Sequence, residues 1–380
     1  LRRDQVLRTG FETSRGRRRP HRHFERRCDR RRFTLRRKIR AAGRTGVGLN
    51  TPPDYSVSPC PACGRRTGPF LTTRDWEYGL PGYYHIYKCA GCGTGWTEPQ
   101  LSDEEVGALY PAGSYYAFAE PKPVRVSSWL RAARGAGASR WRRALASIFR
   151  VVLNRRYYGV PQFVSSGRLL DVGAGTGTFV ALAEELGWDA VGVEANPSAA
   201  ARARGAGRDV RTGSGETLAN VTGLRFNYFR FHHVLEHMAA PEKALRAAAA
   251  LAEPGARLLA AVPNIGGAGA KLFRRYWYHW AVPFHRRHFD RRTLINLLRQ
   301  TGWTPVRVFY VSNVQGFTRS WAAFLADRAG IKLRWQRGFE ERLVQTVMRP
   351  LLLALDLWGW GDNVVVEATL APPLQQRKET

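Results

Sequence analysis

The segment Asp171-Val-Gly173-Ala-Gly175-Thr-Gly177 has residue types and a spacing that suit the binding of a nucleotide. Glycines let the chain turn tightly after a strand, and their missing side chains let a ligand lie against the backbone. Glu194 follows 17 residues after Gly177, at the end of the next apolar run, where a carboxylate can accept both hydroxyls of a ribose. We therefore predict that a nucleoside-containing cofactor lies across this turn.

The spacing of the glycines distinguishes between two candidate cofactors. The dinucleotide fingerprint G-x-G-x-x-G would need a glycine at Thr178, whereas this chain has G-x-G-x-G. Asp171, two residues before the first glycine, is unneeded for a negatively charged pyrophosphate but suits the positively charged amine of a methionyl group. This favours S-adenosylmethionine. The alternative, in which the glycines serve packing alone, does not account for the acid at Glu194.

Four cysteines form two C-x-x-C pairs that are 25 residues apart, each pair followed by a glycine: Cys60 with Cys63, and Cys89 with Cys92. Four thiolates suit a tetrahedral zinc ion, and the trailing glycines permit the tight turns that aim two sulfur atoms at one point. Four cysteines leave no open position on the metal, so we predict structural Zn²⁺. The alternative is two reduced pairs without metal. The fifth cysteine, Cys28, has no partner by spacing.

Several segments resemble class I S-adenosylmethionine-dependent methyltransferases. Residues 169–199 resemble motif I and the second strand of that class, residues 231–237 resemble the fourth-strand motif of the group called methyltransferase type 11, 12 or 23, and residues 277–289 resemble the substrate side of the type 23 branch. One departure is Asn227, where the family usually has Asp. The cofactor contacts that the resemblance implies are Asp171, Gly173, Ala174, Gly175, Gly177, Glu194, Ala195, Glu216, Phe231 and His232.

Histidines gather after two of the predicted strands, at the sheet edge where ligands bind in such folds. A hydroxyl or carbon acid must lose a proton to accept a methyl group, and histidine is the usual base near neutral pH. The candidates for catalysis are His285, His237 and His288. For each of them the plainer interpretation is a structural hydrogen bond.

Two acceptor classes follow from these features. The type 23 segment and the cysteine module, which resembles a ribbon found ahead of sugar-modifying methyltransferases, favour O- or C-methylation of a small molecule such as a sugar or nucleotide sugar. The alternative is an RNA base, since an rRNA methyltransferase family also has a zinc ribbon and the chain is basic. Against RNA, the predicted fifth strand ends in Val-Pro-Asn and no Asn-Pro-Pro-Tyr signature occurs. A scaffold with a degenerate cofactor site is disfavoured by the intact glycine turn and its acids.

The elements that must position these residues alternate from Gly167 onward. Predicted strands cover 168–173, 190–194, 226–231, 257–262, 306–311 and 363–370, and predicted helices cover 179–186, 197–204, 241–251 and 293–300. Such alternation predicts a mainly parallel sheet covered on both faces. The expected fold class is α/β: a Rossmann-like, doubly wound, seven-stranded sheet with a small N-terminal zinc ribbon and a disordered basic arm.

The predicted domains follow from shifts in composition along the chain. They are a disordered basic arm (1–50), the zinc ribbon (51–100), a helical linker or cap (101–165), the S-adenosylmethionine-binding core (166–312), a helical insertion with the final strand (313–372) and a tail (373–380).

Charge is concentrated at one end of the chain. The net charge is +30, and residues 1–50 contribute +14 of it through 18 Lys and Arg against four Asp and Glu. This arm either binds an acidic partner, targets the chain, or has no function; no apolar segment of the kind that follows a targeting arm is present.

Residues 343–360 are the longest apolar stretch, and Arg349 and Asp356 interrupt it. We predict no membrane span and a cytoplasmic location. We expect residues 347–360 to form a cap or part of the core, and a dimer face or a membrane-surface helix is the alternative.

Overall fold

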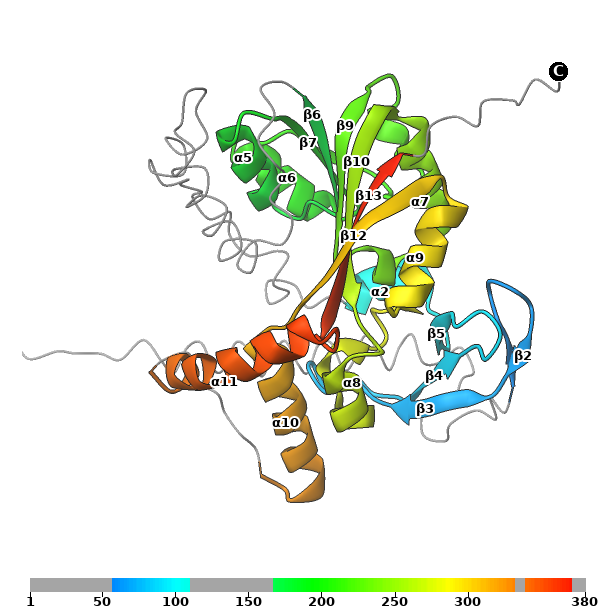
Figure 1. Ribbon diagram of the computed structural model, residues 1–380, viewed down its shortest axis with the longest axis vertical. Helices are drawn as coiled ribbons and strands as arrows, with labels where there is room; N and C mark the ends of the chain where they lie inside the picture. Colours follow the sequence, from blue (N-terminus) through cyan, green and yellow to red (C-terminus); the bar gives the residue numbers. More distant parts are fainter. Residues whose placement is uncertain (1–56, 110–166, 332–338, 371–380) are drawn as a thin grey trace, which may run out of the picture. The chain divides into compact units, whose positions relative to one another are not determined.

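A seven-stranded sheet forms the centre of the protein (Figure 1). The computed structural model describes residues 57–109, 167–331 and 339–370. The strand order is β12-β13-β10-β9-β6-β7-β8, and β13 runs antiparallel to both of its neighbours while the pairs from β10 to β8 are parallel. This confirms the predicted α/β class with a mainly parallel, seven-stranded sheet. The strands are β6 (Arg168–Val172), β7 (Asp189–Glu194), β8 (Val210–Thr212), β9 (Phe226–His232), β10 (Ala252–Pro263), β12 (Trp303–Val311) and β13 (Asn363–Leu370).

Helices cover both faces of this sheet. Figure 1 shows α5 (Thr178–Glu185) and α6 (Pro197–Gly205) on one face and α7 (Pro241–Ala250) and α9 (Arg291–Gln300) on the other. Successive residues of a strand point to opposite faces, so neighbouring residues of β6 enter different cores. The strand order changes direction beside β6, which places the switch point of the fold between β6 and β9. Ligands bind at such a point in open α/β sheets.

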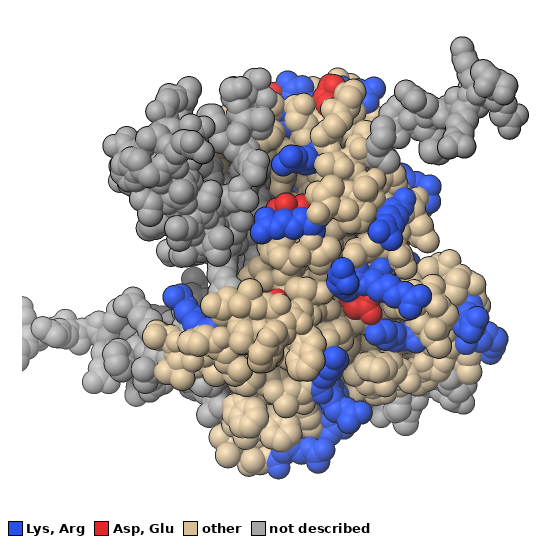
Figure 2. All heavy atoms as spheres, viewed as in Figure 1, with Lys and Arg blue, Asp and Glu red and all other residues tan. Residues whose placement is uncertain are grey.

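Basic side chains dominate the charged part of the surface. On the face seen in Figure 2, Lys and Arg lie over several elements, with uncharged surface between them and few Asp or Glu. The predicted basic arm lies outside the described residues. So does nearly all of the predicted helical linker, of which only α2 (Asp103–Leu109) is described.

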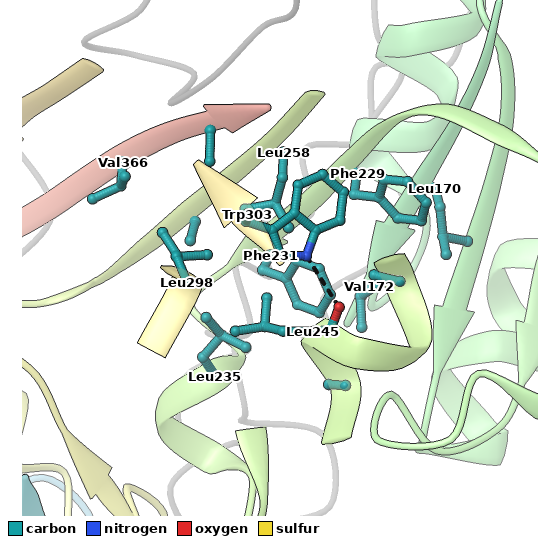
Figure 3. Close-up of a cluster of buried hydrophobic side chains, with 14 of the residues drawn as sticks. Leu170, Val172, Phe229, Phe231, Leu235, Leu245, Leu258, Leu298, Trp303 and Val366 are labelled. Atoms are coloured by element: carbon teal, nitrogen blue, oxygen red, sulfur yellow. Dashed lines mark hydrogen bonds between the residues drawn. The ribbon is translucent and has the colours of Figure 1, made fainter. Parts of the chain in front are cut away.

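The core on the α7 and α9 face is rich in aromatic rings (Figure 3). The ring of Trp303 lies 5.5 Å from that of Phe229, and its Nε1 donates to the Leu245 carbonyl at 3.0 Å. Both side chains are fully buried. Burying a large aromatic side chain stabilises the fold by about 1.5–3 kcal/mol, and the bonded indole N–H avoids the cost of an unpaired donor. This packing fixes the edge strand β12 against the sheet.

The cysteine module is continuous with the rest of the fold. Its four-stranded sheet has the order β11-β5-β4-β3, and β11 belongs to the segment that follows the fifth strand of the central sheet. A two-stranded sheet, β1 with β2, carries the first cysteine pair. The strands are β1 (Ser58–Pro59), β2 (Arg66–Thr67), β3 (Pro69–Thr73), β4 (Tyr84–Lys88), β5 (Gly95–Glu98) and β11 (Arg287–His288).

The remaining described helices lie in the second half of the chain. They are α8 (Ala268–Phe273), α10 (Val314–Arg328), α11 (Phe339–Leu357) and the short helices η2 (Ala219–Val221), η3 (Leu235–His237), η4 (Arg274–Tyr276) and η5 (Tyr278–Trp280). Among the described helices, none has the length and apolar character needed to cross a membrane.

Candidate active site

The glycine turn leaves β6 and enters α5 in a conformation that only glycine adopts easily. Gly173 has φ +76° and Gly177, the residue before α5, has φ +70°. The N–H groups of Gly173 and Ala174 donate to the Val193 carbonyl at 2.8 and 3.1 Å, which ties the turn to the end of β7. A β-carbon on Gly173 would lie 2.8 Å from Val234 Cγ2. The turn is therefore held close to two neighbouring strand ends.

Glu194 lies against this turn. Its Oε2 accepts the Gly175 N–H at 2.8 Å, and its Oε1 accepts the Asn196 N–H at 2.8 Å. Burial raises the pKa of the Glu194 carboxyl, and the two backbone donors oppose that shift. Each carboxylate oxygen has a second lone pair, so the side chain is oriented while it can still accept hydroxyls of a ligand.

Asp171 is paired inside the protein. Its Oδ1 accepts from Arg230 at 2.7 Å, and β6 and β9 place the two residues side by side. The guanidinium of Arg230 also lies 3.8 Å from the ring centre of Phe179. Burial raises the pKa of the Asp171 carboxyl, whereas the adjacent guanidinium lowers it. The predicted partner of a methionyl amine thus forms part of a buried ion pair.

The other predicted cofactor residues differ in their exposure and in the atoms that they can offer a ligand. Ala195 is exposed at the end of β7, whereas Phe231 is fully buried among the core side chains of Figure 3 and can offer a ligand only backbone atoms. Glu216 accepts the N–H of Ala240, just before α7, at 3.0 Å. Burial lowers the pKa of His232 well below its ordinary value, with a smaller contribution from Arg230, so its ring is neutral at pH 7.

Two of the three predicted catalytic histidines come together. The rings of His237 and His285 lie edge to face with centres 4.6 Å apart. His237 Nδ1 lies 3.0 Å from the Phe284 carbonyl, and His285 Nδ1 lies 2.9 Å from the His279 carbonyl. Burial lowers the pKa of both rings. They form a neutral pair at the carboxyl edge of the central sheet.

The third predicted catalytic histidine faces the cysteine module. His288 Nε2 lies 2.8 Å from Thr97 Oγ1, and the ring is buried. Burial lowers its pKa to about 3. Thr97 Oγ1 also donates to the His285 carbonyl at 2.8 Å. His288 therefore joins β11 to β5, which is the structural alternative that the sequence left open for each histidine.

The four cysteines of the two C-x-x-C pairs converge. Cys60 Sγ lies 3.5 Å from Cys92 Sγ, Cys63 Sγ lies 3.6 Å from Cys89 Sγ, and all four sulfur atoms lie within 4.8 Å of one another. A zinc–sulfur bond of about 2.3 Å gives a tetrahedron edge of about 3.8 Å. The spacing therefore fits a tetrahedral metal ion, and the donor set of four thiolates fits zinc.

Sequence reasoning missed two residues of this region. Arg230 faces Asp171, but its pairing depends on the register between β6 and β9. Glu236 lies within residues 231–237, to which the sequence assigned a family resemblance but no role for this acid; its side chain is buried, and its Oε1 lies 3.0 Å from His233 Nδ1. Two signals in the sequence could have identified them: a charged residue inside an apolar strand, and an acid next to histidines.

One family model matches part of this chain. Residues 139–308 match a family model, Methyltransf_23, described as a methyltransferase domain. No protein among the curated sequences matches this chain.

Solved structures with a similar fold include three methyltransferases. A SAM-dependent methyltransferase from Archaeoglobus fulgidus is 18% identical, with a TM-score of 0.40, and the match covers 57% of this chain and 91% of that one. One from Thermotoga maritima, described as a possible histamine N-methyltransferase, is 20% identical, with a TM-score of 0.38 and coverage of 60% and 97%. The 1,6-didemethyltoxoflavin-N1-methyltransferase of Burkholderia thailandensis is 18% identical, with a TM-score of 0.38 and coverage of 76% and 96%. These distant similarities do not identify an acceptor.

The family match includes the glycine turn, Glu194 and the histidine pair. The match spans 170 of the 380 residues, and over this part the chain is similar to a methyltransferase domain.

Proposed function

We propose that this protein transfers the methyl group of S-adenosylmethionine to an oxygen or carbon atom of a small, carbohydrate-like acceptor. The observation that carries the proposal is the pair of hydrogen bonds that holds the Glu194 carboxylate against the glycine turn at the carboxyl edge of the sheet. A carboxylate fixed there suits the two hydroxyls of a ribose.

The neighbouring ion pair supports the same cofactor. Asp171 and Arg230 offer one negative and one positive group next to the turn. The methionyl end of the cofactor carries one charge of each sign, so a mixed pair suits it better than an acid alone. All of the cofactor contacts stay predictions: Asp171, Gly173, Ala174, Gly175, Gly177, Glu194, Ala195, Glu216, Phe231 and His232.

The acceptor side is assigned to the cluster around His237 and His285. The sulfonium is already a strong methyl donor, so the protein mainly has to align the acceptor with it and remove a proton from the acceptor. The neutral pair His237 and His285 lies at the edge of the sheet where such an acceptor would enter. His288 is better explained by its bond to Thr97.

Structural zinc in the cysteine module is part of this proposal. The two knuckles have matching backbone bonds: Gly64 donates to Cys60 at 2.8 Å, and Gly93 donates to Cys89 at 2.9 Å. Zinc held by four thiolates has no position for a substrate, so its role would be to fold the module. The cytoplasmic location remains a prediction.

RNA is the second candidate acceptor, because the chain is strongly basic. Figure 2 shows the basic side chains of the visible face spread over several elements, which gives less support to a single strand-binding groove. A protein that makes about 6–10 phosphate contacts with RNA loses about 10³- to 10⁵-fold in affinity when salt rises from about 50 to about 200 mM, whereas a nucleotide sugar offers only a diphosphate and its binding should respond far less.

A methyl-labelling experiment tests the proposal. The full chain would be incubated with methyl-labelled S-adenosylmethionine and either a panel of nucleotide sugars or ribosomal RNA, at low and high salt. We expect label in a carbohydrate product with little salt dependence. Label in RNA that disappears at high salt would replace the acceptor assignment, and failure of S-adenosylhomocysteine to bind would overturn the cofactor assignment.

A further inference from the structure

We propose that Glu236, His237 and His285 bind one divalent transition-metal ion, at a site distinct from the four cysteines. A carboxylate oxygen of Glu236 and one ring nitrogen of each histidine lie within 4.8 Å of one another. Two imidazoles and one carboxylate are a donor set that binds zinc or iron(II) and leaves coordination positions open. The existence of this site is independent of the proposed function, but its chemical role rests on it.

The two histidines are oriented as metal ligands are. Each ring directs Nδ1 at a backbone carbonyl, of Phe284 for His237 and of His279 for His285. A carbonyl oxygen only accepts, so Nδ1 carries the proton in both rings and Nε2 keeps its lone pair. Metal-binding histidines are held in this way, with the second nitrogen donating to a carbonyl or carboxylate. Neither Nε2 has a hydrogen-bond partner among the described residues.

Glu236 supplies an independent observation. Its side chain is 1% exposed, and Oε2 has no hydrogen-bond partner within the described part of the chain, while Oε1 is close to His233. A buried carboxylate oxygen without a partner is costly. The Glu236 carbonyl accepts the Arg286 N–H at 2.8 Å, which fixes the two segments of the cluster to each other. A cation bound by the carboxylate and one ring nitrogen of each histidine would satisfy the unpartnered oxygen of Glu236.

Such an ion would serve the proposed reaction. A hydroxyl bound to a divalent cation loses its proton more easily. The acceptor oxygen would then bond to the methyl carbon, the carbon–sulfur bond of the cofactor would break with its electron pair remaining on sulfur, and the hydroxyl proton would pass to water. In this arrangement His237 and His285 act as ligands and need not take up the proton themselves.

Cobalt binding tests the site without any acceptor. The full-length protein would be stripped of metal and titrated with Co²⁺, whose thiolate complexes absorb in the near ultraviolet while nitrogen and oxygen complexes do not. We expect two ions per wild-type chain, one of them without thiolate absorption, and one ion in His237→Asn and His285→Asn. His288→Asn, a buried histidine of the same segment outside the cluster, should keep two.

Circular dichroism and S-adenosylhomocysteine affinity would show that the variants are folded. If His285→Asn does not fold, Glu236→Gln, which keeps the shape of the side chain, should lower the cobalt affinity of the second site about tenfold or more. One ion in the wild type, or two ions in the folded ligand variants, would overturn the proposal. Two ions in a protein that transfers no methyl group would count against the proposed function and leave the metal site standing.

Discussion

At the scale of single residues, Glu194 is the side chain on which we expect cofactor binding to depend most. Its oxygens are held by the N–H groups of Gly175 and Asn196, so it is oriented before a ribose arrives. Hydrogen bonds to a charged group contribute about 1.5–3 kcal/mol each. Because the carboxylate is already in place, little ordering entropy is lost when the cofactor binds.

Replacing Glu194 should therefore weaken cofactor binding. We expect Glu194→Ala to raise the dissociation constant of S-adenosylhomocysteine about 10- to 100-fold, since about 1.4 kcal/mol corresponds to a factor of ten. Calorimetric titration would measure it. Glu194→Gln should lose less, and Glu185→Gln, an exposed acid on α5, should bind as the wild type does. Equal affinity of Glu194→Ala and wild type would remove the ribose assignment.

The Asp171–Arg230 pair makes a prediction about stability. The two side chains are 1% and 11% exposed, so removing the cation leaves a buried, uncompensated carboxylate. Breaking a buried pair from one side costs about 3–5 kcal/mol. Arg230→Met should lower the free energy of unfolding by that amount in urea titrations. The double variant Asp171→Asn/Arg230→Met should lose much less than the sum of the two single changes; additive losses would show that the groups are not coupled.

Residue order predicts some of this site and not the rest. Asp171, the glycines and Glu194 could be recognised because they belong to one strand, one turn and the next strand end, which local sequence specifies. Arg230 meets Asp171 only through the register of two strands that are 59 residues apart. The histidine pair was found as residue types near a strand end, but its orientation depends on the carbonyls of Phe284 and His279.

At the scale of elements, the turn between β6 and α5 depends on the absence of a side chain at Gly173. The residue has φ +76°, and an added β-carbon would lie 2.8 Å from Val234. Gly173→Ala should therefore destabilise the protein by about 1–3 kcal/mol and weaken S-adenosylhomocysteine binding at the same time. Thermal denaturation with and without the ligand would measure both effects.

Gly205 provides the matched control for that change. It is the last residue of α6, and a β-carbon there would meet no atom within 4 Å. Gly205→Ala should be neutral or stabilising by up to about 1 kcal/mol, because alanine is the better helix former. Similar losses in both variants would mean that the turn is not specially constrained.

Element prediction succeeded where apolar runs are long and failed where pairing defines the strand. The bounds predicted for β6, β7, β9 and β13 agree with the structure within one residue, whereas β10 begins five residues and β12 three residues earlier than predicted. β8 has three residues, and β11 has two, Arg287 and His288, which are extended only because they pair with β5. A sequence cannot indicate a strand of two polar residues whose partner lies almost 200 positions away.

At the scale of the whole molecule, the cysteine module and the proposed acceptor side form one structure. Thr97 of β5 donates to the His285 carbonyl and lies within hydrogen-bond distance of His288, and β5 pairs with β11. The glycine turn and Glu194 have no hydrogen bond to this module within the described residues. Unfolding of the module should consequently affect the acceptor side and spare the cofactor side.

Cys63→Ser tests this separation. Cys63 is the exposed member of the four cysteines, so its replacement removes a thiolate with little loss of packing. We expect the variant to lose about one bound zinc per chain and to be cleaved by protease within the module, because metal binding and folding of such modules are coupled. Its kcat/KM for the acceptor should fall about tenfold or more, as small misplacements of catalytic groups are costly, while S-adenosylhomocysteine affinity stays within about twofold of wild type.

Cys28→Ser, a cysteine outside the two C-x-x-C pairs, is the matched control and should change none of these quantities. Comparing S-adenosylhomocysteine affinity with acceptor turnover distinguishes between two explanations. If Cys63→Ser lowered S-adenosylhomocysteine affinity as much as acceptor turnover, the module would be stabilising the whole domain, and its bonds through Thr97 would have no special part. If only kcat/KM for the acceptor falls, the bonds through Thr97 link zinc-dependent folding of the module to the position of His285.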